Sequence, residues 1–216
     1  MRASQNDVDQ PFRFSKPKLV SQKVQSQVIL CDAFDVQRNI EIPCILKFFP
    51  PGANTAYERE LAVYSAVESS TELQESVPLS LWSGTWSAAK YFDFLGHSLP
   101  KSLRKNDGQI SVIGLPYIHS VDSISNGPED LRLFLAKSAL HSLRRLHANR
   151  ITHGDVSVSN VLIEREDDVG YSLYWIDFSS STVEASTRSI IYEWEKALEY
   201  FSDLVHNPFD GPNTQR

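Results

Sequence analysis

The amino-acid sequence predicts an α+β fold with a β-rich front half and a mostly helical rear half. Short apolar or alternating runs, typical of strands, occur between residues 19 and 49 and again over residues 111–115. Two long segments in the rear half carry apolar residues at helical spacing. A chain of 216 residues, 41% of them hydrophobic, suits one domain or two small lobes that share a cleft.

The composition excludes several classes of protein. No apolar run approaches the roughly 20 residues of a membrane-spanning helix, and no apolar stretch follows the first basic residue as a secretory signal requires. A net charge of −6 argues against a role in coating nucleic acid, which needs a basic surface. Cys31 and Cys44 cannot form a disulfide framework, so we expect both to be reduced and buried. We therefore expect an intracellular protein, cytoplasmic or nuclear, with no membrane contact.

The front half divides into an arm, strands and one helix. Residues 1–18 are polar and contain two prolines, which predicts a flexible N-terminal arm. The segment Ile40 to Phe49 is predicted to be a strand that ends at the Pro-Pro-Gly run directly after it. A helix should follow, because Thr55 and Glu58 match a capping box. Its apolar face is predicted to comprise Tyr57, Leu61, Tyr64 and Val67.

The middle of the chain is harder to interpret. Residues 69–110 contain the short apolar pieces VPLSLW and YFDFL between Ser, Gly and Lys residues, and we expect strands there. A long surface loop is predicted around Lys101 to Gly108. The run Ser111 to Leu115 is predicted to be a short buried strand.

The rear half begins with the clearest helix. Pro128 suits the first helical position, and acidic residues follow it. The apolar face of this helix comprises Leu131, Leu135, Ala139, Leu143 and Leu146. Two short strands, Asn160 to Ile163 and Tyr171 to Phe178, are predicted to form a hairpin around a turn at residues 167–170. A final helix is expected from about Ser186 to Val205. Its predicted buried stripe comprises Ile190, Ile191, Trp194, Leu198, Phe201 and Val205.

The segment Thr152 to Ile163, THGDVSVSNVLI, carries the strongest chemical signal. Asp155 precedes Asn160 by five residues, and Asp177 follows seventeen residues later at the end of an apolar strand. If the hairpin folds back, the oxygens of Asn160 and Asp177 can bind a metal ion together. A capped turn before a strand is the alternative, because Asp and Asn both favour turns.

These motifs resemble those of the protein-kinase-like superfamily, which also contains the aminoglycoside and choline kinases. The His-Gly-Asp form, with Ser two residues after Asp155, is nearer to these atypical members than to ordinary serine/threonine kinases. It is also similar to the small kinase of the tRNA threonylcarbamoylation complex and to fungal kinase-like proteins. The resemblance covers about Ile40 to Phe178 and is strongest at residues 152–163 and 174–179.

The resemblance implies a two-lobed protein-kinase-like fold with a β-rich N-lobe and a shortened helical C-lobe. After the arm of residues 1–18, the N-lobe and hinge would cover residues 19–118, with a nucleotide-facing sheet and one helix. A minimal C-lobe over residues 119–216 would contain the catalytic loop and the metal-binding Asp.

The resemblance also implies the catalytic roles. Asp155 would position or deprotonate the acceptor hydroxyl, with Asn160 beside it, and Asn160 and Asp177 would hold Mg2+. We interpret His153 as a packed scaffold histidine. His147 has no metal-ligand spacing with either cysteine, so a zinc site is not expected.

Nucleotide binding is assigned to the front half. Lys47 shares an apolar strand face with Ile45 and Phe49, and a lysine there needs a compensating anion. The resemblance implies that this anion is the α- and β-phosphate groups of ATP. It also implies that a glutamate on a helix pairs with the lysine and orients it. Glu60 is chosen over Glu58 because Glu60 lies on the apolar face of its helix, whereas the capping box already accounts for Glu58.

The hinge is placed by the same comparison. Pro116 and Ile118 follow the strand Ser111 to Leu115, and they would meet the adenine through the Pro116 carbonyl and the Ile118 amide. The first of these positions needs only a carbonyl, so a proline there loses nothing by lacking an N–H.

The sequence departs from the family pattern in several places. No glycine occurs between Leu19 and Phe34, where the phosphate loop is expected, and Ser179 replaces the usual glycine after Asp-Phe. Only 39 residues follow Asp177, so we expect no peptide-docking half.

Two functions remain open. The chain is either a phosphotransferase that moves the γ-phosphate of ATP to a hydroxyl of a protein or small molecule, or a pseudokinase, a scaffold without turnover that binds nucleotide or a partner protein. A minimal enzyme, an inactive relative and a piece of a longer kinase all fit this length.

Overall fold

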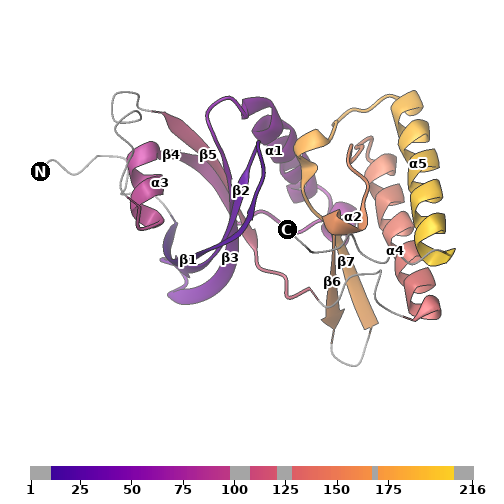
Figure 1. Cartoon of the computed structure of the whole chain (residues 1–216), viewed down its shortest axis with the longest axis horizontal. Helices are drawn as coiled ribbons and strands as arrows, with labels where there is room; N and C mark the ends of the chain where they lie inside the picture. Colours follow the sequence, from indigo (N-terminus) through magenta and orange to yellow (C-terminus); the bar gives the residue numbers. More distant parts are fainter. Residues whose placement is uncertain (1–10, 98–107, 121–127, 167–169, 207–216) are drawn as a thin grey trace, which may run out of the picture. The chain divides into compact units, whose positions relative to one another are not determined.

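The computed structural model describes residues 11–97, 108–120, 128–166 and 170–206, and the fold is α+β as predicted (Figure 1). The chain forms two compact units. The first comprises the chain up to Asn54 together with Ser80–Tyr117, and the second comprises Thr55–Leu79 and the chain from Ile118 onward. None of the helices in the described part of the chain is long and apolar enough to cross a membrane.

The first unit is built on a five-stranded antiparallel sheet with the strand order β1-β2-β3-β5-β4. The strands are β1 (Phe12–Gln22), β2 (Gln27–Asp35), β3 (Ile40–Phe49), β4 (Trp82–Ser87) and β5 (Gln109–Pro116). The predicted strands over residues 40–49 and 111–115 are therefore confirmed. The short helix α3 (Ala88–Phe94) follows β4.

One face of this sheet carries the core of the first unit. Cys44, Leu46 and Phe48 alternate along β3 and pack with Trp86, whose ring meets that of Phe48 edge to face. Cys31 of β2 lies directly opposite Cys44, and their Sγ atoms are 3.3 Å apart. Both cysteines are free and buried, as expected.

The arm predicted for residues 1–18 is a strand from Phe12 onward, and residues 1–10 lie outside the described part of the chain. Phe12 and Phe14 pack against the core, and the ring of Phe14 lies 5.8 Å from that of Trp86. Pro17 falls at a register shift in this edge strand, where a missing N–H does little harm. Packing of two aromatic residues therefore outweighs the polar composition of the segment.

The helix α3 replaces one of the strands expected between residues 69 and 110. Ser87 caps α3, because its hydroxyl accepts a hydrogen bond from the Lys90 N–H at 3.2 Å. Tyr91 and Phe94 then pack on the core at a spacing of three residues, which suits a helix. The loop predicted around Lys101 to Gly108 lies almost wholly outside the described residues.

The second unit is mostly helical. It contains α1 (Asn54–Glu68), α2 (Thr71–Gln74), α4 (Glu129–Ala148) and α5 (Thr187–His206), and α4 packs against α5. The strands β6 (Val161–Glu166) and β7 (Gly170–Trp175) form the predicted antiparallel hairpin. Two single 3-10 turns, η2 (Val158–Asn160) and η3 (Phe178–Ser180), flank this hairpin.

The helix α1 begins at Asn54, one residue before Thr55, so Thr55 lies inside the first turn and does not cap it. The capping-box prediction is therefore wrong. Tyr64 and Val67 are buried as predicted, and Glu60 is fully buried beside them, whereas Glu58 is exposed.

The buried face of α5 differs from the predicted stripe. Phe201 and Val205 are buried as expected, but Ile191 and Leu198 are 53% and 43% exposed. The buried face instead includes Glu193 and Ala197. A glutamate on the inner face defeats a prediction made from apolar spacing alone.

Candidate active site

Asp155 and Asn160 are joined by hydrogen bonds from a single side chain. The Asn160 Nδ2 donates to the backbone oxygen of Asp155 at 2.8 Å and to its carboxylate Oδ2 at 3.0 Å. The turn η2 closes this arrangement, because the Asn160 N–H donates to the Ser157 oxygen. Asn160 is buried and Asp155 is exposed, so the carboxylate is accessible while its partner is held. Since the amide nitrogen faces Asp155, the amide oxygen of Asn160 faces away from it.

The hairpin brings Asp177 to the same end as Asn160. Val161 pairs with Trp175, and the Ile176 N–H donates to the backbone carbonyl oxygen of Asn160 at 3.0 Å. The condition stated from the sequence, that the hairpin folds back, is therefore met. The predicted strand to Phe178 ends earlier, at Trp175, because the backbone turns at Asp177.

Asp177 has a left-handed backbone, with φ 64° and ψ 64°. This conformation costs of order 1 kcal/mol or more in a residue other than glycine, and such strain collects at functional sites. Ser179, which stands where a glycine was expected, is in η3 without a positive φ. Its hydroxyl donates to Asp177 Oδ1 at 2.8 Å, so the serine holds the carboxylate.

The donor set at this end of the hairpin suits a hard cation. An amide oxygen from Asn160 and a carboxylate from Asp177 are both ligands that Mg2+ accepts, and Mg2+ usually takes its other ligands from phosphates and water. No cluster of three or more His, Cys, Asp or Glu that could hold a metal occurs among residues 11–97, 108–120, 128–166 and 170–206. Neither Asn160 nor Asp177 offers the imidazole or thiolate ligand that most zinc sites in proteins contain.

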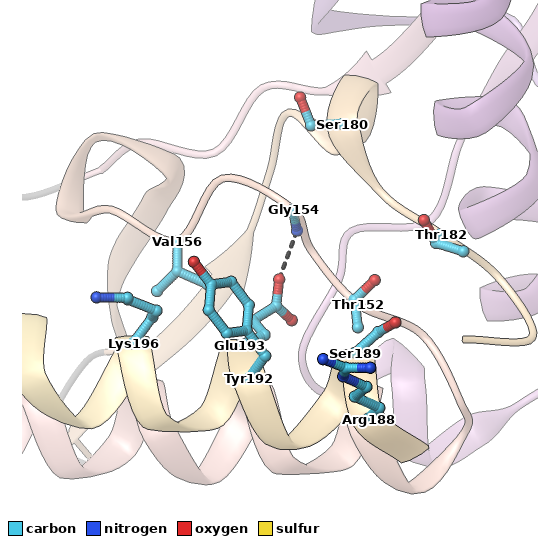
Figure 2. A pocket seen from close by; sticks show the side chains of 10 residues that line it. All are labelled: Thr152, Gly154, Val156, Ser180, Thr182, Arg188, Ser189, Tyr192, Glu193 and Lys196. Carbon is cyan, nitrogen blue, oxygen red and sulfur yellow. Dashed lines mark hydrogen bonds between the residues drawn. The ribbon is translucent and has the colours of Figure 1, made fainter. Parts of the chain in front are cut away.

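Glu193 of α5 holds the loop that carries Asp155. Its carboxylate accepts hydrogen bonds from the backbone N–H groups of His153, at 2.9 Å, and Gly154, at 2.6 Å. Figure 2 shows the bond from Gly154. The Nε2 of His147, from α4, lies 2.7 Å from the same carboxylate. Burial alone would raise the pKa of Glu193, but the hydrogen bonds from His147, Gly154 and His153 outweigh it and lower the pKa.

His153 joins the loop to the segment before Asp177. It is fully buried; its Nε2 donates to the Ile176 oxygen at 3.0 Å, and its Nδ1 accepts from the Asp155 N–H at 3.3 Å. This pattern is that of a neutral imidazole, and burial lowers the pKa of His153, which favours the same form. The geometry agrees with the interpretation of His153 as a scaffold residue.

Gly154 is required by a close backbone approach. Its φ is +81°, and a Cβ at this position would overlap the carbonyl oxygen of Ser180. The neighbouring residues Thr152 and Thr182 exchange two backbone hydrogen bonds, at 3.0 and 3.1 Å. The segment after Asp177 is thereby tied directly onto the loop that carries Asp155.

The helix α1 contributes Glu60 and Tyr64 to the same region. The ring of Tyr64 meets that of Phe178 edge to face at 5.9 Å. Burial raises the pKa of Tyr64, and the negative charges of Glu60 and Asp177 raise it further.

Lys47 is only 4% exposed, and its Nζ lies 5.3 Å from the centre of the Phe49 ring. The alternation along β3 places Lys47 on the face opposite the Cys44, Leu46 and Phe48 core, as predicted. Lys47 belongs to the first unit and Glu60 to the second, so their pairing stays a prediction.

The predicted hinge lies where the chain passes from the first unit to the second, between Tyr117 and Ile118. Pro116 ends β5 opposite Cys44, and the Tyr117 N–H donates to the Pro43 oxygen at 3.2 Å. The Ile118 carbonyl accepts a bond from the Ser120 N–H at 2.8 Å. Contact of Pro116 and Ile118 with an adenine stays a prediction.

The turn between β1 and β2 contains no glycine. It is closed by a hydrogen bond from the Lys23 N–H to the Ser26 oxygen at 2.8 Å. Val24 at its tip is 96% exposed. Side chains therefore occupy the turn where the family resemblance calls for bare backbone.

Sequence reasoning missed Glu193 and assigned no role to His147. The signal was present but weak: Glu193 lies four residues before Ala197 and eight before Phe201, on the inner face of α5. A buried glutamate at such a position needs partners, and the loop N–H groups supply them.

Comparison with known proteins gives a limited similarity. No model of a known protein family matches this chain. Over 77 residues it is 32% identical to a protein of Acanthamoeba polyphaga mimivirus named "Putative serine/threonine-protein kinase L268". The match covers 33% of this chain and 13% of the length of the viral protein. The similarity supports a kinase-like relationship and does not reach the atypical subtype suggested by the His-Gly-Asp motif.

Proposed function

We propose that this chain is an ATP- and magnesium-dependent phosphotransferase with a two-lobed protein-kinase-like fold of the atypical His-Gly-Asp type. The observation that carries the proposal is the joined arrangement of Asp155, Asn160 and Asp177. The side chain of Asn160 is bonded to Asp155, and its backbone is bonded to the residue before Asp177. Three residues of the expected types thus share one short, hydrogen-bonded frame.

Each residue of this frame has a chemical task. Asn160 and Asp177 would hold Mg2+, which supplies charge neutralisation for the phosphates of ATP. Asp155 is exposed and would orient the acceptor hydroxyl and take its proton. The hydroxyl oxygen forms a bond to the γ-phosphorus while the bond from that phosphorus to ADP breaks.

Residues outside this frame would bind the nucleotide. Lys47, oriented by Glu60, would contact the α- and β-phosphates, as the family resemblance implies. Pro116 and Ile118 would contact the adenine. The acceptor is a hydroxyl of a protein or a small molecule.

The proposal is tested by the effect of nucleotide on thermal stability. ATP with Mg2+ at about 100 times its dissociation constant should stabilise the folded chain by about 2.7 kcal/mol, which is readily measured as a rise in Tm. Asp177→Ala should abolish this rise. Asp203→Ala, at an exposed position of α5, is the matched control and should retain it. Absence of any shift at millimolar ATP and Mg2+ would refute nucleotide binding.

Turnover is tested separately. Asp155→Asn keeps the size of the side chain and removes its basicity, so the rate of ADP formation should fall by about 100-fold or more. ATP stabilisation of the same variant should persist. Unchanged turnover in Asp155→Asn would remove Asp155 from its proposed catalytic role.

A scaffold without turnover is the second candidate, and the glycine-free turn between β1 and β2 favours it. A turn with side chains at residues 23–26 limits close backbone approach to phosphates. This candidate predicts that ADP formation stays at the level of the Asp155→Asn variant under all conditions. Measured turnover above that level decides for the enzyme.

A further inference from the structure

A cavity of about 480 Å³ adjoins the loop that carries Asp155. It lies within the second unit, and three segments form it: the loop itself, the segment after Asp177, and the first half of α5. Its lining comprises Thr152, Gly154, Val156, Ser180, Thr182, Arg188, Ser189, Tyr192, Glu193 and Lys196. Gly154 and Val156 are the two chain neighbours of Asp155, so the cavity adjoins the loop on both sides of the residue proposed to be catalytic.

The charge of the cavity lining is positive. Its single carboxylate, Glu193, is buried and takes up the hydrogen bonds of His147, His153 and Gly154. The two remaining charged side chains, Arg188 and Lys196, are both cations and both exposed. An incoming ligand therefore meets the positive charges of Arg188 and Lys196. The negative charge of Glu193 is already compensated by its hydrogen bonds within the protein.

The two cations lie at opposite ends of the cavity. Figure 2 shows Arg188 with Ser189 at one end and Lys196 with Val156 at the other, with Tyr192 and Glu193 between them. Eight residues along a helix correspond to about 12 Å, which a small molecule with two polar ends can span. Lys196 also lies 3.1 Å from Glu199, in an exposed ion pair that contributes little and is readily exchanged for another anion.

Arg188 is placed where its own helix favours an anion. It is the second residue of α5, and the N-terminal end of a helix dipole repels a cation and attracts a negative group. Its guanidinium can bind a carboxylate or phosphate with two parallel hydrogen bonds. Hydroxyl groups of the lining, such as those of Ser180 and Tyr192, offer further donors.

From this geometry we propose that the cavity is the acceptor site and that its acceptor is a small anionic alcohol. The molecule would place a carboxylate or phosphate at Arg188 and its hydroxyl toward Asp155. The cavity volume lies within the usual range for small-molecule sites. The proposal rests on the phosphotransfer proposed above, in which the hydroxyl gains the γ-phosphoryl group, ADP leaves and Asp155 takes the proton.

Binding is measured by calorimetry without nucleotide, so the result does not depend on ATP binding or turnover. The probes are glycerol 3-phosphate and glycerate as anionic alcohols, glycerol as a neutral one and choline as a cationic one. Either anion should bind at least about 10-fold more tightly than glycerol or choline, because a charged hydrogen bond to Arg188 is gained. The tighter of the two anions identifies the anionic group. Equal affinity for all four probes, or no binding at millimolar concentration, would overturn the proposal.

Variants of the cavity test its mechanism. Arg188→Gln should weaken binding of the preferred anion by about 10- to 100-fold, and Arg188→Lys should weaken it less, since the charge is kept. Arg144→Gln, at an exposed position of α4, is the matched control and should change nothing. An unchanged affinity in Arg188→Gln would refute the role of Arg188. Tighter binding of an acidic Ser-containing peptide than of either small anion would refute the choice of a small molecule.

The two proposals fail in different ways. If the anion binds but ATP with Mg2+ gives no thermal stabilisation, phosphotransfer is refuted. The cavity is then not an acceptor site but an anion-binding site without chemistry. If ATP stabilises the chain but no anionic alcohol binds, phosphotransfer stands and the acceptor assignment falls.

Discussion

The hydrogen bonds of Glu193 make its replacement the most direct test of how the loop carrying Asp155 is held. In Glu193→Ala, the N–H of His153 and the side chain of His147 both lose a buried acceptor. Each buried polar group left without a partner costs about 1–3 kcal/mol. The Gly154 N–H adds less, because Gly154 is exposed and water can replace the carboxylate. The expected loss is therefore about 2–6 kcal/mol, a large part of the usual 5–15 kcal/mol of total stability.

The loss is measured by urea unfolding, with tryptophan fluorescence as the signal. Trp175 and Trp194 report on the region, since their rings lie 4.9 Å from that of His153 and 6.0 Å from that of His147. Glu193→Gln keeps one acceptor oxygen and should cost less than Glu193→Ala. Glu195→Ala, two residues along the same helix and exposed, should change the free energy of unfolding by no more than about 0.5 kcal/mol. If Glu193→Ala loses no more stability than Glu195→Ala, the carboxylate does not hold the loop.

Two further predictions concern the same loop. Gly154→Ala should cost about 2–4 kcal/mol, because a left-handed backbone strains alanine and the new methyl group overlaps backbone. Gly52→Ala shares a positive φ but meets open space, so it should lose only the backbone part, and equal losses in the two variants would contradict the overlap. The free energy of unfolding should also decrease as the pH drops below about 6.5. Burial lowers the pKa of His153 in the folded chain, so the same histidine is protonated at a higher pH in the unfolded chain, and this favours unfolding. Glu193 extends this fall: its pKa is lowered in the fold, so its contribution is present above the ordinary glutamate pKa and is lost as the pH drops through the folded value. Urea midpoints measured from pH 8 down to about pH 2 cover both windows, and a midpoint that stays constant across this range would contradict both predictions.

The rear half was predictable because its signals are local. The helical spacing before residue 148 and the hairpin at residues 161–175 depend on neighbours along the chain. The five-residue spacing of Asp155 and Asn160 is closed by one 3-10 turn, and the register of the hairpin then carries Asp177 to the same end. Short-range geometry was sufficient for these three residues.

The predictions that proved wrong depended on partners far away in the chain. Phe12 and Phe14 form a strand because Trp86 and β2 receive them, and no local pattern in a polar segment indicates this. The inner face of α5 was misplaced because Glu193 serves N–H groups forty residues earlier in the chain. A prediction from apolar spacing places a charged residue such as Glu193 on the exposed face of the helix.

The sequence by itself determined the α+β class, the rear helices and the hairpin, and it singled out Asp155, Asn160 and Asp177 through a family resemblance. Only the tertiary structure showed that Gly154 lies against the backbone of Ser180 and that the Glu193 carboxylate binds the backbone of the loop. It also showed that Arg188 and Lys196 line one cavity next to the loop that carries Asp155. The physical reason is the range of the interactions. Helices and hairpins follow from neighbours along the chain, whereas a cavity and its charge depend on which distant segments pack together.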